Sequence, residues 1–416
     1  MFQKHPILSP DVCYKSTGKS IKFEVGNDSF ELELDSLCLT KNVKKVLEHL
    51  ELKELDLAKK VDLSPYSFEQ LIEILDSECI VTEFDPKDIR VFSGKKLICD
   101  QERYYYKHVL SQLHPDIFTQ QLEDKSVSNE TLLRWALQYS FITQNAESCI
   151  AASLINKDLN DHLREQLFSF FREEIGHQKL LKSASDYSKA ELESVVVHVS
   201  TLSIVGNLLY YSIFDLPSFI AMVMMLEGNA SDSQRYIDVL DSSDLGEEFT
   251  RGQKKHEQIN IDACHGDEAR EIAKYLPHIS KDDIERSKRS IKNHVFNRQY
   301  MNSYLISGTY HPNLSKGFVR KVLKENWGYL LSRTAFTAIA NSNGKIKDQL
   351  VAMVSRAKIR NDYDIEGKSF PIIEMYCSAI WFIAYSDPKK YLYTISSIEG
   401  GKKNTNACEI ISSSIW

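Results

Sequence analysis

Two acid–histidine pairs and one further carboxylate give this sequence the residue types of a metal site. Glu174 and His177 stand three residues apart in a run rich in Phe and Leu, and Asp262 and His265 repeat that spacing. Residues three apart share a helix face, so each pair can offer an oxygen and a nitrogen to one ion. Glu227 follows the apolar run AMVMML, where an ionised carboxylate is costly unless it is paired, protonated or bound to a metal.

Carboxylate and imidazole ligands together suit iron or manganese, and an open position on such an ion admits dioxygen. The sequence therefore predicts a metal site for iron or manganese that is open to dioxygen. The predicted metal ligands are Glu174, His177, Glu227, Asp262 and His265. Each ligand also has a structural explanation, because surface pairs, carboxylates at helix ends and histidines at helix C-termini are common without a metal.

Helical segments between residues 128 and 305 must position these side chains. Apolar residues recur every three to four positions there, which is the period of a helix with one buried face. The clearest segments are 129–154, 160–184, 190–214 and 216–231. The second of them is expected to be a helix that carries both Glu174 and His177. We therefore predict a mainly α-helical protein in which residues 128–305 form a bundle.

The order of these motifs resembles that of the heme-oxygenase-like di-iron oxidases, relatives of the helical domains of thiaminase-II-type and pyrroloquinoline-quinone-synthesis proteins. The similar runs are DLNDHLREQLFSFFREEIGHQKLL, DLPSFIAMVMMLEGN and HEQINIDACHGD. The resemblance implies a heme-oxygenase-like bundle and an oxygenase or oxidase that uses non-heme iron. The implied cofactor is Fe2+, as one ion or as the two of a di-iron site, and the implied co-substrate is dioxygen.

The third metal helix of that family usually carries a further histidine, and this sequence departs from the pattern there. Gln258 occupies that position, four residues before Asp262. His256 points well off the face of Asp262 and His265 in a regular helix, so it is expected to reach the site only if the helix is distorted. The sequence therefore leaves open whether the site holds one metal ion or two. Glu147, 27 residues before Glu174, would complete the ligand pattern of a ferritin-like bundle, which is the competing fold.

The first 90 residues predict a small winged-helix module of mixed α and β structure. Residues 21–34 alternate with period two around Gly26-Asn27-Asp28, which indicates a hairpin. Three helical stretches and the short β-like run CIVTEF follow. Residues 91–127 are expected to be a linking and packing segment.

The charge of this module argues against nucleic acid as its partner. Residues 20–85 contain seven lysines, no arginine and sixteen acidic residues, a surface that would repel phosphate. The module instead resembles the leader-peptide recognition modules of ribosomal-peptide maturation, which implies that it binds a precursor or leader peptide as an added strand.

Together the two resemblances imply an iron enzyme that oxidises a ribosomally made precursor peptide or an amino-acid-derived substrate. One alternative is a non-catalytic scaffold or binding protein in a peptide-maturation complex. Another is a metal-free enzyme of the same fold that acts on a small molecule.

Residues 306–416 are expected to form a helical C-terminal extension. The run AIWFIAYSDPKKYLYTISSIEGGKKNTNACEIISSSI resembles the closing segment of ADP-ribosylglycohydrolases, whose GGDxDTxA motif supplies two metal-binding aspartates. Lys402 and Asn404 occupy those positions here, and neither replaces a carboxylate ligand. We therefore expect a structural role for this segment.

The composition of the 416 residues is that of a cytoplasmic globular protein. The net formal charge is −7, from 51 basic and 58 acidic residues, so no positive surplus favours nucleic acid. No apolar run is long enough to span a bilayer, and the N-terminal residues lack the pattern of a signal peptide. The eight cysteines form no CxxC pair and are expected to be reduced thiols. The sequence leaves open whether the protein forms a homodimer.

Overall fold

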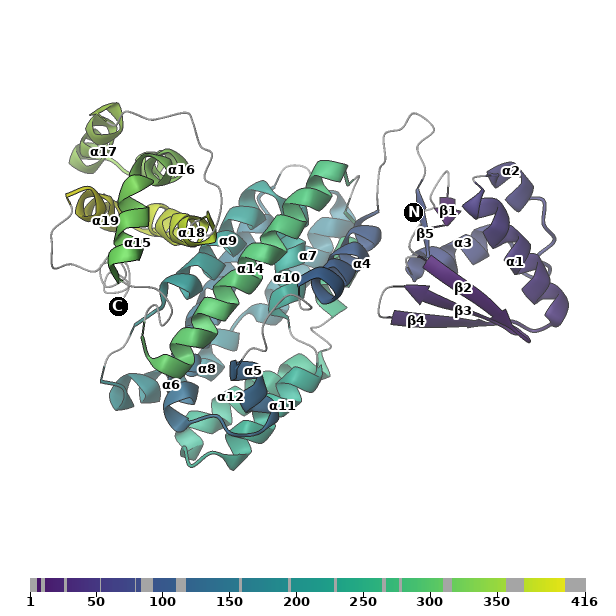
Figure 1. Cartoon of the computed structure of the whole chain (residues 1–416), viewed down its shortest axis with the longest axis horizontal. Coiled ribbons are helices and arrows are strands. Elements are labelled where there is room, and N and C mark those ends of the chain that lie inside the picture. The colour runs from purple at the N-terminus through teal and green to yellow at the C-terminus, as the bar shows by residue number, and fades with distance from the viewer. Residues whose placement is uncertain are drawn as a thin grey trace. The chain divides into compact units, whose positions relative to one another are not determined.

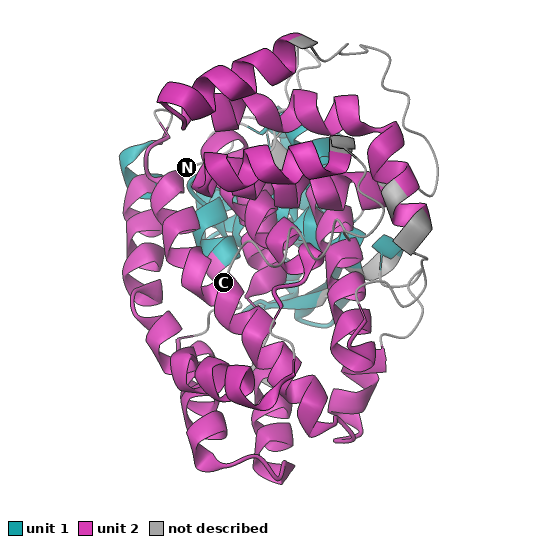
Figure 2. Ribbon diagram, turned by 90° about the vertical axis from the view of Figure 1, so that its left-hand side faces the viewer, with its two compact units in different colours: residues 1–113, 160–163, 269–289 teal, residues 114–159, 164–268, 290–416 magenta. Residues whose placement is uncertain are grey.

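The structure is a computed structural model that describes most of the chain, and Figure 1 labels its helices and strands. The chain forms two compact units, which Figure 2 shows in different colours. Unit 1 contains residues 1–113, 160–163 and 269–289; unit 2 contains residues 114–159, 164–268 and 290–416. The residues described are 6–8, 12–25, 28–52, 54–78, 80–83, 93–109, 117–156, 159–193, 196–227, 230–263, 267–276, 279–309, 316–356 and 370–400. Most of them are helical, as the sequence predicts, and a small antiparallel sheet lies near the N-terminus.

The N-terminal sheet has three strands in the order β2-β3-β4, which are Val12–Thr17, Ser20–Val25 and Asp28–Glu33. Val25 pairs with Asp28, which confirms the predicted hairpin. The helices that follow are α1 (Leu37–Glu51), α2 (Leu55–Ala58) and α3 (Phe68–Ser77). After them β5 (Val81–Glu83) pairs with β1 (Pro6–Leu8) in a second, two-stranded sheet. The predicted layout of two strands, three helices and a strand is present, with β1 and β2 in addition.

The core of this module forms between the sheet and α1. Ile21 and Phe23 of β3 are fully buried, as are Val46, Leu47 and Leu50 of α1. Alternation along the strand and a spacing of three to four along the helix bring both apolar faces together. Burial of these faces, rather than local propensity, is the main source of stability for such short elements.

Unit 1 also contains α4 (Gly94–Tyr104), the π-helical turn η1 (Tyr105–Val109), nearly all of α13 (Glu268–Ala273) and the N-terminal part of α14 (Lys281–Ser307). Gly94 lies so close to the Ala273 carbonyl oxygen that a side chain at this position would overlap it. The Arg270 guanidinium donates to both carboxylate oxygens of Glu102, at 2.8 and 2.9 Å. The close contact at Gly94 and the bidentate ion pair therefore join α4 and α13, which are far apart in the sequence.

Unit 2 is helical in all of its described elements. Its bundle consists of α5 (Ile117–Glu123), α6 (Asn129–Ser153), α7 (Asp161–Glu174), α8 (His177–Glu191), α9 (Val199–Phe214), α10 (Leu216–Leu226), α11 (Ala230–Ser242), α12 (Glu247–Asp262) and the C-terminal part of α14 (Lys281–Ser307). Helix α6 packs against α8 and α9, and α8 packs against α12. The predicted bundle helices are present, although α9 begins at Val199 rather than near residue 190.

The predicted helix over residues 160–184 is two helices. Helix α7 ends at Glu174, α8 begins at His177, and Gly176 between them has a φ of 94°. This left-handed conformation is readily adopted by glycine, which has no Cβ, and it interrupts the helix. The Gly176 amide donates to Oε1 of Glu147 at 2.8 Å, so a carboxylate from α6 stabilises the break.

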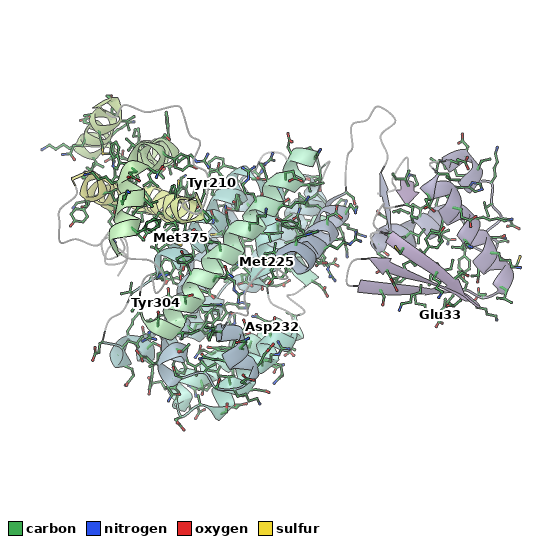
Figure 3. The ribbon with its side chains drawn as sticks, viewed as in Figure 1. Glu33, Tyr210, Met225, Asp232, Tyr304 and Met375 are labelled. Atoms are coloured by element: carbon green, nitrogen blue, oxygen red, sulfur yellow. The ribbon has the colours of Figure 1, made fainter. Side chains whose placement is uncertain are left out.

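The C-terminal helices of unit 2 are α15 (Lys316–Glu325), α16 (Trp327–Ala340), α17 (Gly344–Arg356), α18 (Phe370–Ser386) and α19 (Pro388–Gly400). Helix α18 packs against α9 of the bundle, and Figure 3 labels Tyr210 and Met375 on these two helices. Gly206 of α9 lies against the Ser378 carbonyl oxygen, and Ser378 donates to Oδ1 of Asn207 at 2.7 Å. The positions of Lys402 and Asn404 lie outside the described residues.

Every helix within the described ranges is too short or too polar to cross a lipid bilayer.

Candidate metal centre

Glu174 and His177 lie together inside unit 2, on either side of the helix break. Both side chains are buried, with 6% and 7% of their residue surface exposed. Nδ1 of His177 lies 3.3 Å from Oε2 of Glu174. The imidazole of His177 and the carboxylate of Glu174 are therefore in direct contact.

A second buried acid–histidine pair faces the first, and it comes from α12. His256 and Glu257 are 4% and 6% exposed, and the His256 ring centroid lies 5.1 Å from that of His177. Gly252, one turn before His256, allows this approach because it lies directly against the Leu180 carbonyl oxygen of α8. Two helices in such close contact bring the two imidazoles side by side.

The structure does not bring Asp262 to this site. Its side chain is exposed and accepts a hydrogen bond from Nε2 of Gln258 at 2.8 Å. Helix α12 is continuous from residue 247 to 262, and six residues correspond to about 600° of helical rotation, so His256 and Asp262 point in different directions. His256 therefore faces inward without any distortion of the helix, contrary to expectation. His265 lies outside the described residues.

Glu227 lies at the C-terminal end of the apolar helix α10, where its backbone amide closes the last turn on Val223. Its side chain is half-buried. The charges of Glu257, Glu227 and Glu174 all raise the pKa of the buried Tyr139 hydroxyl, after the larger effect of burial itself. The carboxylates of these three residues, from three different segments, therefore lie within electrostatic range of one phenol.

Tyr139 of α6 is the residue that touches both members of the second pair. Its hydroxyl lies 3.1 Å from Oε1 of Glu257 and 3.3 Å from Nδ1 of His256. Its ring stacks on Trp135 with a centroid distance of 5.2 Å. The ring stacking restrains the side chain that carries the hydroxyl.

Comparison with known proteins adds no assignment. No family model matches the chain, and no curated protein is significantly similar to it.

The donor types at this site fit a transition metal, although their present arrangement does not close around one. Among the described residues, no three His, Cys, Asp or Glu side chains lie close enough together to hold one ion. Glu257 is bonded to Tyr139, and Glu147 to the Gly176 amide. Two imidazoles with several carboxylates nevertheless form the mixed nitrogen and oxygen set that suits iron or manganese. Binding of one ion by this set would require some of the carboxylates to adopt other rotamers.

The sequence contained a signal for the inward face of α12. Phe249, Gln253, His256 and Asn260 recur at intervals of four, three and four, which is the spacing of one helix face. The first three of them are buried, and Asn260 is half-buried. Tyr139 had no comparable signal, because an aromatic residue at helical spacing is ordinarily part of the core.

Proposed function

We propose that unit 2 is a non-heme iron protein that oxidises its substrate with dioxygen. The observation that carries the proposal is the contact between His177 and His256, two buried imidazoles of which the first also contacts the carboxylate of Glu174. Imidazole and carboxylate groups that lie close together form the mixed nitrogen and oxygen set that suits iron or manganese. The resemblance to heme-oxygenase-like di-iron oxidases supports the same chemistry.

The proposed ligands are the imidazoles of His177 and His256 and the carboxylates of Glu174 and Glu227. Glu257, whose Oε1 lies 3.5 Å from Nδ1 of His256, and Glu147, which accepts from the Gly176 amide, would be the candidates for further oxygens if two ions bind. A bound iron would supply a centre at which dioxygen is reduced while the substrate is oxidised.

Apolar residues beside the ligands would keep water from the oxidant. Met222 and Val223 of α10 are buried, and so is Met225, which Figure 3 labels. Exclusion of water by such a wall limits side reactions of a reactive centre.

A peptide is the proposed substrate because the N-terminal module has the means to bind one. Strand β4 pairs with β3 on one side and has no strand partner on the other among the described residues. An extended peptide can add to such an edge through main-chain hydrogen bonds. The substrate would then be a ribosomally made precursor peptide or an amino-acid derivative.

Ferrous iron binding tests the proposal directly. Protein purified without oxygen should bind about one or two ferrous ions per chain, as helical-bundle iron sites do. Replacing His177 or His256 with alanine should weaken that binding at least about tenfold, because each replacement removes a nitrogen ligand. Bound iron is counted with a colorimetric chelator after gel filtration under anaerobic conditions.

Asp262→Asn is the matched control, because Asp262 is a carboxylate of the same helix with an exposed side chain. It should bind iron as the unaltered protein does. If Asp262→Asn loses iron and His256→Ala does not, the opposite face of α12 forms the site. If neither the unaltered protein nor any variant binds iron, the proposal is wrong. The alternatives are then a scaffold protein or a metal-free enzyme.

A further inference from the structure

A chain of hydrogen bonds connects His256 to Glu257 through the hydroxyl of Tyr139. The carboxylate of Glu257 can only accept, so Tyr139 donates its one proton to Oε1 across 3.1 Å. The hydroxyl oxygen then faces Nδ1 of His256 at 3.3 Å with lone pairs and no proton of its own. Nδ1 must therefore carry the proton in this contact.

One other neighbour of Nδ1 favours the same protonation, and a second does so once its amide group is turned over. Oε1 of Glu257 is a second acceptor, 3.5 Å from Nδ1. The amide nitrogen of Asn260 also lies 3.5 Å from Nδ1, while its amide oxygen is buried without a hydrogen-bond partner among the described residues. Turning this amide over places its oxygen toward Nδ1, and the two orientations of an amide are distinguished by such contacts. Each acceptor stabilises the form of His256 with the proton on Nδ1.

We propose that Tyr139 is a positioning residue that holds His256 as the Nδ1–H tautomer and so leaves the Nε2 lone pair for the metal. Ligating histidines commonly donate their second ring N–H to a carboxylate, directly or through another group, and this fixes the ring and its basicity. Here Tyr139 stands between the imidazole and the carboxylate of Glu257. The claim about the tautomer stands on contacts in the metal-free protein; the claim about the metal rests on the proposed function.

The surroundings of Tyr139 suit this role because they fix where its hydroxyl lies. Trp135 stacks on one side of the ring with an interplanar angle of 18°, and the His256 ring meets it edge-on with a centroid distance of 5.4 Å.

Nitrogen-15 NMR of the histidine rings in the metal-free full-length protein tests the tautomer. The unaltered protein should show His256 with a protonated Nδ1 and an unprotonated Nε2. Tyr139→Phe, which removes the hydroxyl and keeps the ring, should move this signal toward a mixture of the two tautomers. A His256 signal unchanged by Tyr139→Phe, or one with the proton on Nε2 in the unaltered protein, overturns the proposal.

Tyr236→Phe is the matched control because it removes another buried hydroxyl beside the same tryptophan. Tyr236 lies 6.3 Å from Trp135, ring to ring, and donates to Oε1 of Gln253 at 2.7 Å, not to His256. It should leave the His256 tautomer as it is. A tautomer change in both variants would indicate a general disturbance of packing and would overturn the specific role of Tyr139.

Anaerobic titration with ferrous iron tests the consequence for the metal. Tyr139→Phe should weaken iron binding by about tenfold to a hundredfold, the usual effect of removing a hydrogen-bond partner of a ligating histidine. Tyr236→Phe should not weaken it. If the unaltered protein binds no iron, the proposed function fails while the NMR result still decides the tautomer. If iron binds equally well to the unaltered protein and to Tyr139→Phe, the positioning role is wrong.

Discussion

Replacing Gly252 with alanine is expected to separate α12 from α8, destabilise the protein and weaken iron binding. A Cβ at this position would overlap the Leu180 carbonyl oxygen, a backbone atom that moves only with its helix, and would lie 3.4 Å from Oγ of Ser183. Overpacking of this kind costs about 1–3 kcal/mol, and the better helix propensity of alanine offsets at most about 1 kcal/mol. His256 lies one turn away, so its distance from His177 would increase.

The measurements for Gly252→Ala are the free energy of unfolding in urea and the affinity for ferrous iron. Gly328→Ala is the matched control, because Gly328 is also helical and a methyl group added there would meet no described heavy atom within 4 Å. Alanine there should raise the free energy of unfolding by about 0.5–1 kcal/mol. Equal stability changes in the two variants would show that α8 and α12 are not in close contact at Gly252.

Acid is expected to destabilise the protein through His294 of α14. This imidazole is fully buried, and neither ring nitrogen has a hydrogen-bond partner among the described residues. Burial first, and then the charge of Arg298, lower its pKa to about 3. The ring in the unfolded chain takes up a proton below about pH 6.5, whereas the folded ring stays neutral. The unfolded state therefore binds more protons as the pH falls, and the free energy of unfolding decreases.

The expected contribution of His294 is a loss of about 2 kcal/mol between pH 7 and pH 5, at about 1.4 kcal/mol per pH unit below 6.5. His294→Gln removes the titrating group, so this variant should lose about 2 kcal/mol less over the same interval. Urea unfolding at both pH values, with each protein compared with itself at pH 7, gives the difference. Equal losses would mean that the buried ring does not respond to acid as its surroundings predict.

The helices were predictable from the sequence because their apolar spacing is regular, but the break at Gly176 was not. Phe170 and Leu181 lie on either side of it, so the periodic pattern continues across the interruption. One glycine inside a helical pattern is ordinarily tolerated, and nothing local marks this one as left-handed. The partner that stabilises the break, Glu147, comes from another helix, 29 residues away in sequence.

The candidate site was predictable in part, because the sequence indicates which of its residues are buried. Glu174, His177 and Glu227 have apolar neighbours in sequence, and these neighbours indicate burial. In α12, the buried face carries His256, whereas the sequence motif favoured the face with Asp262. Packing against α8 at Gly252 decides between the faces, and this contact depends on a residue that carries no functional group.

The contact between Gly206 and Ser378 limits how far the protein can be shortened. A chain that stopped before α15 would leave the glycine-containing surface of α9 open to water and would deprive Asn207 of its serine donor. Such an exposed apolar surface promotes self-association. Helix α18 is therefore expected to keep the helical bundle from aggregating, and attempts to produce a minimal version of the protein should retain it.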